Sequence, residues 1–269
     1  MKSLTLVFAT LINFSVFAQQ IITDRPDQTE SSSTISKGGF QIESGFLLSM
    51  TEPGEIAGLE GFTAISTRRV LAPTTLFRYG LTKRIEIRVL NQYEIKKSSF
   101  YYEKTFGFSD LEVGTKIQIL KNENKNTEIA FLSHLIIPSG STSFSNNNYA
   151  TINKLSISHN LNDNIGLGYN FGYNYYEAGD GAVQGKGDLT YSMALGIGIS
   201  ENAGIYVEHY GEFVDLTTEH VASLDMGFTY LINNNFQLDF SFGAGINHIM
   251  NYISSGFSWY IGREKSDSQ

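Results

Sequence analysis

The sequence contains no cysteine, one tryptophan and four prolines in 269 residues. Without cysteine, the fold cannot depend on disulfide bonds, although an oxidising compartment would permit them. Long apolar runs are missing as well: the longest, residues 4–18, has about fifteen residues, whereas a spanning helix needs roughly eighteen or more. Basic residues are also few, since 19 Lys and Arg stand against 27 Asp and Glu and the net charge is −8. This balance argues against nucleic acid as a partner, because nucleic-acid sites need an excess of positive charge.

The apolar run near the N-terminus has the features of a cleaved signal peptide. Lys2 precedes it, and Val16-Phe17-Ala18 ends it with the small residue that signal peptidase accepts. We therefore expect residues 1–18 to be a signal peptide removed after Ala18, so that the chain crosses the inner membrane and no helix holds it there. The alternative is that this run forms a buried N-terminal strand.

Glycine and aromatic residues are abundant, with 26 Gly, 19 Phe and 15 Tyr. In residues 165–175 the odd positions carry only large apolar or aromatic side chains, and the even positions carry only glycine and asparagine. The same alternation recurs in residues 189–199, 223–230 and 236–243. A period of two predicts β-strands with one apolar and one polar face.

Strand and loop lengths distinguish a membrane barrel from a soluble sandwich, which would also show alternation. The connections alternate between short turns and longer loops such as residues 96–108, as in single-chain outer-membrane barrels. Most of the expected strands have the roughly nine to eleven residues that cross a bilayer at a tilt. They lie at residues 38–50, 67–80, 84–95, 109–120, 127–138, 149–160, 164–176, 188–200, 203–211, 219–231, 235–245 and 252–262.

The sequence therefore predicts an all-β fold, a transmembrane antiparallel up-and-down β-barrel of about twelve strands, at residues 38–262 in the cell outer membrane. An even number of strands brings both chain ends to the periplasm. A polar tail, residues 263–269, follows the barrel. Tyr175, Tyr230 and Trp259 fall near strand ends on the apolar face, where aromatic residues mark the membrane interfaces. Pro73 predicts a bulge in the second strand, because proline has no N–H for the ladder.

Several stretches of the mature sequence match landmarks of a known family. They read TDRPDQTE (23–30), KGGFQIESG (37–45), LFRYGL (76–81), IEIR (85–88), FSDLEVGTK (108–116) and IPSG (137–140). They resemble, in this order, the opening, the second hairpin and the next two landmarks of the outer-membrane family named for the MetA pathway of phenol degradation. The resemblance covers most of the mature chain and implies a transporter-like barrel.

Charged residues gather on the polar face of the first strands, which we take as the lumen face. Opposite charges there can pair across strands, Arg78 and Arg88 with Glu43 and Glu86. One interpretation is a charged constriction that selects solutes, and the other is a structural ladder that closes the floor of the barrel. We expect the constriction to be formed by Glu43, Arg78, Glu86, Arg88, Asp110, Glu112 and Lys116.

The opposite wall carries inward glycines, which leave room for a narrow passage, a ligand or a plug. Long charged side chains reaching across would instead close the lumen. The segment at residues 19–37 is polar and precedes the first strand. Asp24, Arg25 and Asp27 could fold into the barrel mouth as a plug; the alternative is a periplasmic tail. The glycines of this wall are Gly166, Gly168, Gly172, Gly196, Gly198, Gly227 and Gly243.

No catalytic site is expected. His209 and His220 share the apolar face, but the nearest serine, Ser223, points to the other face, and a nucleophile needs its base within hydrogen-bond reach. No Gly-x-Ser-x-Gly motif occurs, and the scattered carboxylates lack metal-ligand spacing, so we expect neither metal nor cofactor.

The sequence thus predicts a non-enzymatic outer-membrane channel or transporter-like barrel for small solutes. The alternative is a non-conducting barrel with a structural or surface-interaction role. The expected partners are outer-membrane lipid, a small solute and the barrel-assembly machinery during biogenesis.

Overall fold

The computed structural model describes residues 21–52, 66–98, 104–122, 126–179, 183–217 and 219–262. The expected signal peptide, residues 1–18, and the expected tail, residues 263–269, lie outside this part of the chain. The described residues form thirteen β-strands and one short 3-10 helix, η2 (Val214–Leu216). Among these residues, no helix has the length and apolar character needed to span a membrane.

The strands agree closely with those expected from the alternation of the sequence. They are β1 (Phe40–Glu52), β2 (Thr67–Gly80), β3 (Ile85–Ser98), β4 (Lys104–Phe108), β5 (Leu111–Asn122), β6 (Thr127–Ile137), β7 (Ala150–Asn162), β8 (Ile165–Tyr176), β9 (Asp188–Gly198), β10 (Ala203–Phe213), β11 (His220–Asn233), β12 (Phe236–Gly245) and β13 (Ile249–Ile261).

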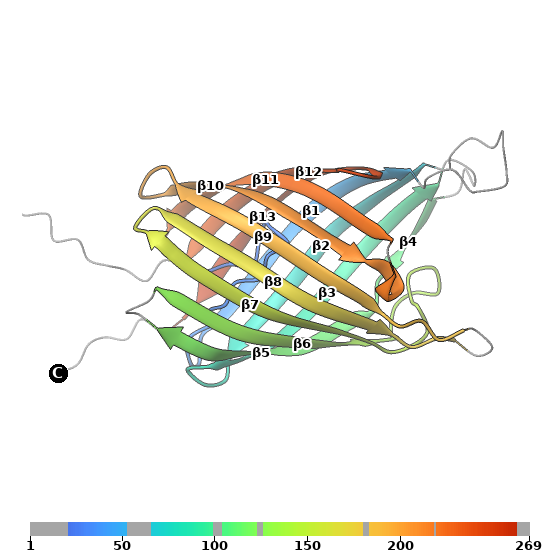
Figure 1. Ribbon diagram of the computed structural model, residues 1–269, viewed down its shortest axis with the longest axis horizontal. Coiled ribbons are helices and arrows are strands. Elements are labelled where there is room, and N and C mark those ends of the chain that lie inside the picture. The colour runs from blue at the N-terminus through green and yellow to red at the C-terminus, as the bar shows by residue number, and fades with distance from the viewer. Residues whose placement is uncertain are drawn as a thin grey trace, which may run out of the picture.

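The sheet closes on itself. β1 pairs antiparallel with β2 on one side and with β13 on the other, β2 pairs with β3, and from β5 to β13 each strand pairs with the next one in the sequence (Figure 1). β4 and β5 both pair with β3, at residues 93–97 and 85–90, so together they occupy one position around the barrel. The described strands therefore fill twelve positions, and the predicted barrel of about twelve strands is confirmed.

One predicted loop is wrong in part. Residues 96–108 were expected to be a loop, but Lys96 and Lys97 continue β3 and Lys104–Phe108 form β4 beside them. The expected bulge in β2 is present, since the register between β2 and β3 shifts between Leu71 and Thr74, on either side of Pro73.

The two faces of the wall differ as the period of two requires. In β12 the side chains of Phe236, Leu238, Phe240 and Phe242 point outward, whereas Gln237, Asp239 and Ser241 are buried inside. An apolar exterior around a polar interior is the reverse of a soluble protein and suits a barrel surrounded by lipid. The buried polar side chains of the wall therefore lie in the lumen.

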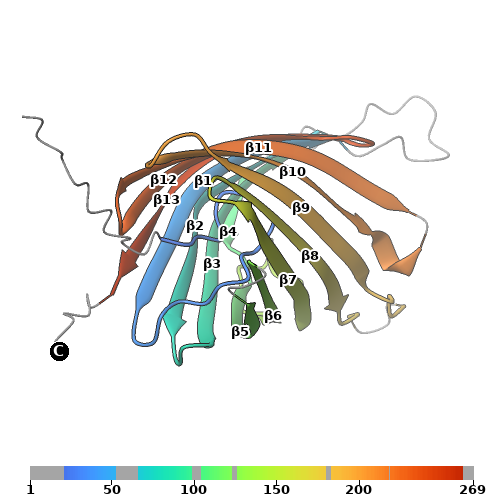
Figure 2. The same cartoon turned by 60° about the vertical axis from the view of Figure 1, so that its left-hand side comes forward.

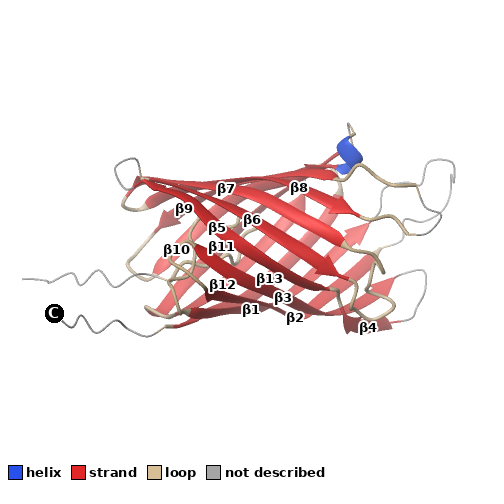
Figure 3. Cartoon of the chain, turned by 90° about the horizontal axis from the view of Figure 1, so that it is seen from below, coloured by secondary structure: helices blue, strands red, loops and turns tan. Residues whose placement is uncertain are grey.

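The ends of the barrel are unlike (Figure 3). Phe40, which begins β1, pairs with Ile261, which ends β13, so the first and last strands meet at one end of the barrel. The short turn at residues 81–84 lies at this end, which we call the turn end, and the longer connections lie at the other, the loop end. In outer-membrane barrels the short turns face the periplasm.

Candidate functional site

The N-terminal residues 21–37, which we call the lumen segment, lie inside the barrel (Figure 2). Its side chains contact strands on several sides of the lumen: Arg25 bonds Asp239 of β12, and Ser33 bonds Glu128 of β6. The chain turns back into β1 at Gly38, whose φ of +77° lies in the region that favours glycine. The segment therefore crosses the interior before the first strand begins.

A network of buried charges occupies the lumen face of β1, β2, β3 and β5. Arg78 and Arg88 stand opposite each other in the β2–β3 pair, a repulsive arrangement unless an acid lies between them. Glu86 supplies that acid: Arg78 donates two hydrogen bonds to it, at 2.9 and 3.0 Å, and Arg88 donates one at 2.9 Å. Arg78 also donates to Glu43 at 2.8 Å. Lys116 stands opposite Glu86 in the β3–β5 pair.

The lumen segment completes this network with two carboxylates. Asp24 forms salt bridges with Arg78 (3.1 Å), Arg88 and Lys116 (2.8 Å). Desolvation alone would raise the pKa of the Asp24 carboxyl, but these three cations hold it well below its usual range. Glu30 accepts a hydrogen bond from Arg88 at 2.8 Å. We call the set the charged cluster: Asp24, Glu30, Glu43, Arg78, Glu86, Arg88 and Lys116.

Two of the residues expected at the constriction lie elsewhere. Within the described residues, Glu112 is joined to the cluster through His134: Arg88 donates to Nε2 at 3.0 Å, so the ring proton is on Nδ1, which faces Glu112 at 3.1 Å. Asp110 is not part of the cluster. It lies between β4 and β5 at the loop end, where its two oxygens accept from the backbone N–H groups of Gly140 and Asn146. Desolvation alone would raise the pKa of Asp110, but a hydrogen bond from the Ser145 side chain together with these backbone bonds holds it below its usual range.

The other wall of the lumen is acidic. Arg25, the residue after Asp24, forms a salt bridge of 3.0 Å with Asp239 of β12 and also donates to Ser254 of β13. Three residues after Arg25, the backbone N–H of Gln28 donates to Glu208 of β10 at 2.7 Å. Thr29 bonds the same carboxylate. Asp24 and Arg25 are adjacent and carry opposite charges, and each thus contacts a wall whose charge is opposite to its own.

Only part of the glycine wall is open. A Cβ added at Gly166 or Gly196 would meet nothing closer than 3.9 Å. In contrast, the rings of Tyr206 and Tyr252 lie over Gly227 and Gly243, so aromatic side chains fill that part of the lumen. The wall therefore has less free space than its glycines suggest.

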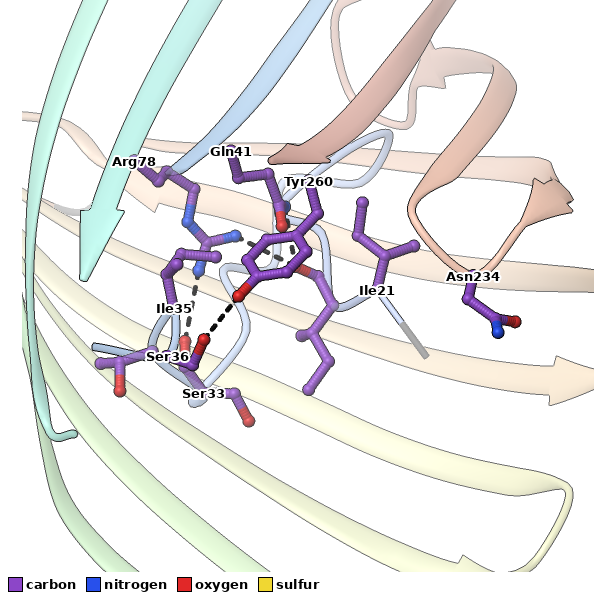
Figure 4. A pocket seen from close by; sticks show the side chains of 10 residues that line it. Ile21, Ser33, Ile35, Ser36, Gln41, Arg78, Asn234 and Tyr260 are labelled. Carbon is purple, nitrogen blue, oxygen red and sulfur yellow. Dashed lines mark hydrogen bonds between the residues drawn. The ribbon is translucent and has the colours of Figure 1, made fainter. Parts of the chain in front are cut away.

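Two cavities lie on either side of the lumen segment. The smaller, about 60 Å³, is at the turn end, where Arg78 donates to the backbone of Ser33 and the hydroxyls of Ser36 and Tyr260 meet at 2.5 Å (Figure 4). The larger, about 360 Å³, opens toward the loop end and has Gln28 of the segment among its lining residues. Its lining is mixed and includes Ile152, Lys154, Asn170, Tyr210, Val221 and Met250.

Comparison with known proteins gives the family. Residues 23–257 match the model of the family described as "Putative MetA-pathway of phenol degradation". The chain belongs to this family. No curated protein matches the sequence.

Solved structures resemble this member of the phenol-degradation family in fold. The COG4313 outer membrane channel from Pseudomonas putida F1 is 11% identical, with a TM-score of 0.70 over 86% of this chain and 98% of that chain. KdgM porin is 12% identical, with a TM-score of 0.51 over 81% of this chain and 99% of that chain. At these identities the likeness shows the fold alone, that of an outer-membrane β-barrel.

Two histidines of the apolar face, His209 and His220, lie beside an aromatic ring. His220 meets the hydroxyl of Tyr191 at 2.8 Å, and His209 stacks on the same ring at 5.4 Å, both on the outer face. Ser223 is buried on the lumen face. In the described residues, no group of three or more His, Asp and Glu side chains could hold a metal ion.

Four residues of the site were not predicted: Glu30, Glu208, Asp225 and Asp239. The last three lie on the polar face of their strands, so alternation already placed them in the lumen. Nothing in the sequence of β10–β12 pointed to the partners of Glu208 and Asp239, because these partners, Gln28 and Arg25, come from the lumen segment. Asp225 accepts a hydrogen bond from Tyr252 of β13.

Proposed function

We propose that this protein is an outer-membrane channel for small solutes, with the charged cluster as its constriction and the lumen segment as its plug. The observation that carries the proposal is that Asp24 meets the cationic wall while the adjacent Arg25 meets the acidic wall. A disordered tail that entered the lumen by chance would have no reason to match both walls residue by residue.

Buried charge supports the role of the plug. Arg78, Arg88 and Lys116 are 0 to 1% exposed. Charges removed from water need partners, since an unpaired buried ion is destabilising by several kcal/mol. Without Asp24 and Glu30, Arg78 and Arg88 would keep only Glu43 and Glu86 as acidic partners in the described part of the chain, and Lys116 would lose both of its salt bridges. The uncompensated positive charge would then require water or solute anions in place of the segment. The lumen is therefore suited to a hydrated passage once the segment leaves.

The constriction would act on solutes through both signs of charge. Glu86, Arg78 and Arg88 lie within one network, so the passage presents donors and acceptors within a few ångströms. Rings of charged side chains select among ions and polar solutes. The larger cavity toward the loop end adds apolar side chains such as Val221 and Met250 before a solute meets the cluster. Outer-membrane lipid surrounds the barrel.

Single-channel recording in planar bilayers tests this function. The mature chain is compared with a variant in which residues 20–37 are replaced by a Gly-Ser linker of equal length. We expect small or rare openings in the first and larger, steadier openings in the second. Circular dichroism and heat-modifiable migration on gels check that both are folded barrels.

The result that contradicts the channel is a folded barrel with no openings in either protein. That outcome would support the second interpretation, a non-conducting barrel with a structural or surface-interaction role. Equal conductance in both proteins would contradict the plug and leave the channel intact.

A further inference from the structure

Three carboxyl groups lie near one another where Gln28 and Thr29 of the lumen segment hydrogen-bond Glu208 of β10. Glu208 and Asp225 stand directly opposite each other in the β10–β11 pair. Both face the lumen, and they are only 1% and 2% exposed. Asp27 comes from the segment, and desolvation together with the charges of Glu208 and Asp225 raises the pKa of its carboxyl well above the usual range. Like charges in opposed positions are destabilising.

Basic side chains do not neutralise this group. In the described part of the chain, no Lys, Arg or His forms a salt bridge with Asp27, Glu208 or Asp225. Arg25 is already paired with Asp239. Lys154 of β7 attracts Glu208 only from beyond ion-pair distance. The three carboxyls therefore need another source of positive charge.

Among the described residues, some buried polar atoms around this group lack a hydrogen-bond partner, and a bound proton would supply a donor. Tyr252 donates to Oδ2 of Asp225 at 2.5 Å, but Oδ1 of the same buried carboxyl has no partner among the described residues. The hydroxyl of Tyr206, on the same wall, also lacks one within that part of the chain. Both oxygens of Glu208 accept bonds from Gln28 and Thr29. Buried acceptors without a donor are rare and call for an explanation. Two carboxyls that share a site bind a proton between them because both cannot ionise.

We propose that Asp27, Glu208 and Asp225 form a proton-binding latch that holds residues 27–29 of the lumen segment against β10 and β11, and that releases them as the pH rises. The latch is a regulatory part of the proposed channel and rests on that function only for its consequence, a wider lumen after release. Its ligand is a proton rather than a metal, because the described acids do not form a metal-binding group.

Proton linkage gives the direction in which pH changes the stability of the docked segment. In the released segment Asp27 would have an ordinary pKa of about 4, and docking raises that value. The docked state therefore binds more protons, so its stabilisation is fully present below about pH 4 and is lost as the pH rises through the raised pKa. The other groups facing the site are Asp24 of the segment, Tyr206, Tyr210 and Tyr252, Lys154, and the Arg25–Asp239 pair. Tyrosine and lysine ordinarily titrate near pH 10.

A spin label tests the latch without requiring conduction. The chain has no cysteine, so Gln28→Cys provides a single labelling site in the larger cavity. Val183→Cys, in a loop and 95% exposed, is the mobile reference. We expect the ratio of mobile to immobile label at position 28 to rise between pH 5 and pH 9, by up to about tenfold per pH unit for each proton released.

Three variants complete the experiment. Asp27→Asn removes the charge without touching the barrel wall, so it should fold and keep the label immobile across the whole range. The double variant Glu208→Gln and Asp225→Asn should do the same. Glu94→Gln, a buried acid that pairs with Arg69 near the loop end, should keep the pH profile of the native chain.

A flat profile in the native background overturns the latch, as does a pH response that persists in Asp27→Asn. Failure of the channel is a separate outcome. If label mobility responds to pH but no variant conducts, the proposed function is wrong and the latch stands.

Discussion

Asp24 and Lys116 form a salt bridge of 2.8 Å inside the lumen, toward the turn end, although 92 residues separate them in the sequence. Both side chains are almost completely buried, at 1% and 0% exposure. Because an unpaired ion in such a place is strongly disfavoured, the position of each depends on the other. The lumen segment and the face of β5 therefore behave as one structural unit.

Asp24→Asn should loosen the lumen segment. The substitution keeps the shape of the side chain but leaves Arg78, Arg88 and Lys116 short of one carboxylate. Breaking a buried ion pair by removing one partner destabilises by about 3–5 kcal/mol, so we expect the label at position 28 to become mobile at pH 6 and conductance to rise. Thr34→Ala is the matched control, because Thr34 makes one long hydrogen bond of 3.4 Å at the surface. An immobile label in Asp24→Asn would contradict the anchoring role.

Docking of the segment should be strongest in mildly acidic solution. The depressed pKa of Asp24 means that its contribution is present above about pH 4 and is lost as the pH falls through the depressed value. The raised pKa of Asp27 has the opposite sign, and its contribution is lost as the pH rises. A plot of immobile label against pH should therefore be bell-shaped. Asp27→Asn should remove only the alkaline limb of this curve. An unchanged alkaline limb would mean that Asp27 does not cause it.

The charged cluster should set ion selectivity in the channel that lacks residues 20–37. Arg88→Met removes a cation and should shift the reversal potential in a KCl gradient toward cation preference, whereas Glu86→Gln should shift it toward anion preference. Glu94→Gln, whose carboxylate is committed to Arg69, serves as the control. Identical reversal potentials in all of these proteins would mean that the cluster is only a structural ladder.

Alternation predicted the strands because every second residue in a barrel wall meets lipid. β4 was missed because Lys104–Phe108 is a five-residue strand that extends the β3 edge and has too few residues to show a period. The core of the cluster was also predictable: hairpins place β2 beside β3, and parity puts Arg78, Glu86 and Arg88 on one face.

The path of the lumen segment could not be predicted in this way. It has no periodicity, and its partners lie far along the chain, as Gln28 and Glu208 do at 180 residues apart. The alternation of their strands places Glu208 and Asp225 on the lumen face, but the role proposed for them depends on Asp27. The position of Asp110 could not be predicted for a related reason. Its place in the alternation points it inward, but the break between β4 and β5 gives it backbone partners at the loop end.

Charge on the outer face should destabilise the barrel according to depth. Phe240 is near the middle of β12 and 45% exposed, whereas Tyr230 lies close to the turn end of β11 and is 42% exposed. Arginine on the lipid face of a barrel costs about 2–4 kcal/mol at the bilayer midplane and about 0–1 kcal/mol near the interface. Reversible urea unfolding in lipid vesicles should therefore show a larger loss for Phe240→Arg than for Tyr230→Arg. Equal losses would contradict the depth assigned to Phe240.

The glycine wall offers a test of how the lumen segment packs against β8. A Cβ added at Gly168 would meet one atom within 4 Å, the Thr29 methyl group at 3.2 Å, so the wall itself has room for a side chain there. Gly166, two residues away on the same face, has nothing nearer than 3.9 Å. Gly168→Val should therefore push Thr29 away from Glu208 and weaken docking by about 1–3 kcal/mol, the usual effect of overpacking.

Gly166→Val is the matched control, because it adds the same side chain to the same strand without meeting the segment. Both variants should fold equally well, since β-branched residues suit strands. The label at position 28 should become mobile only in Gly168→Val. Equal mobility in the two variants would mean that Thr29 does not rest on β8, and the contact that positions the segment beside Glu208 would have to come from elsewhere.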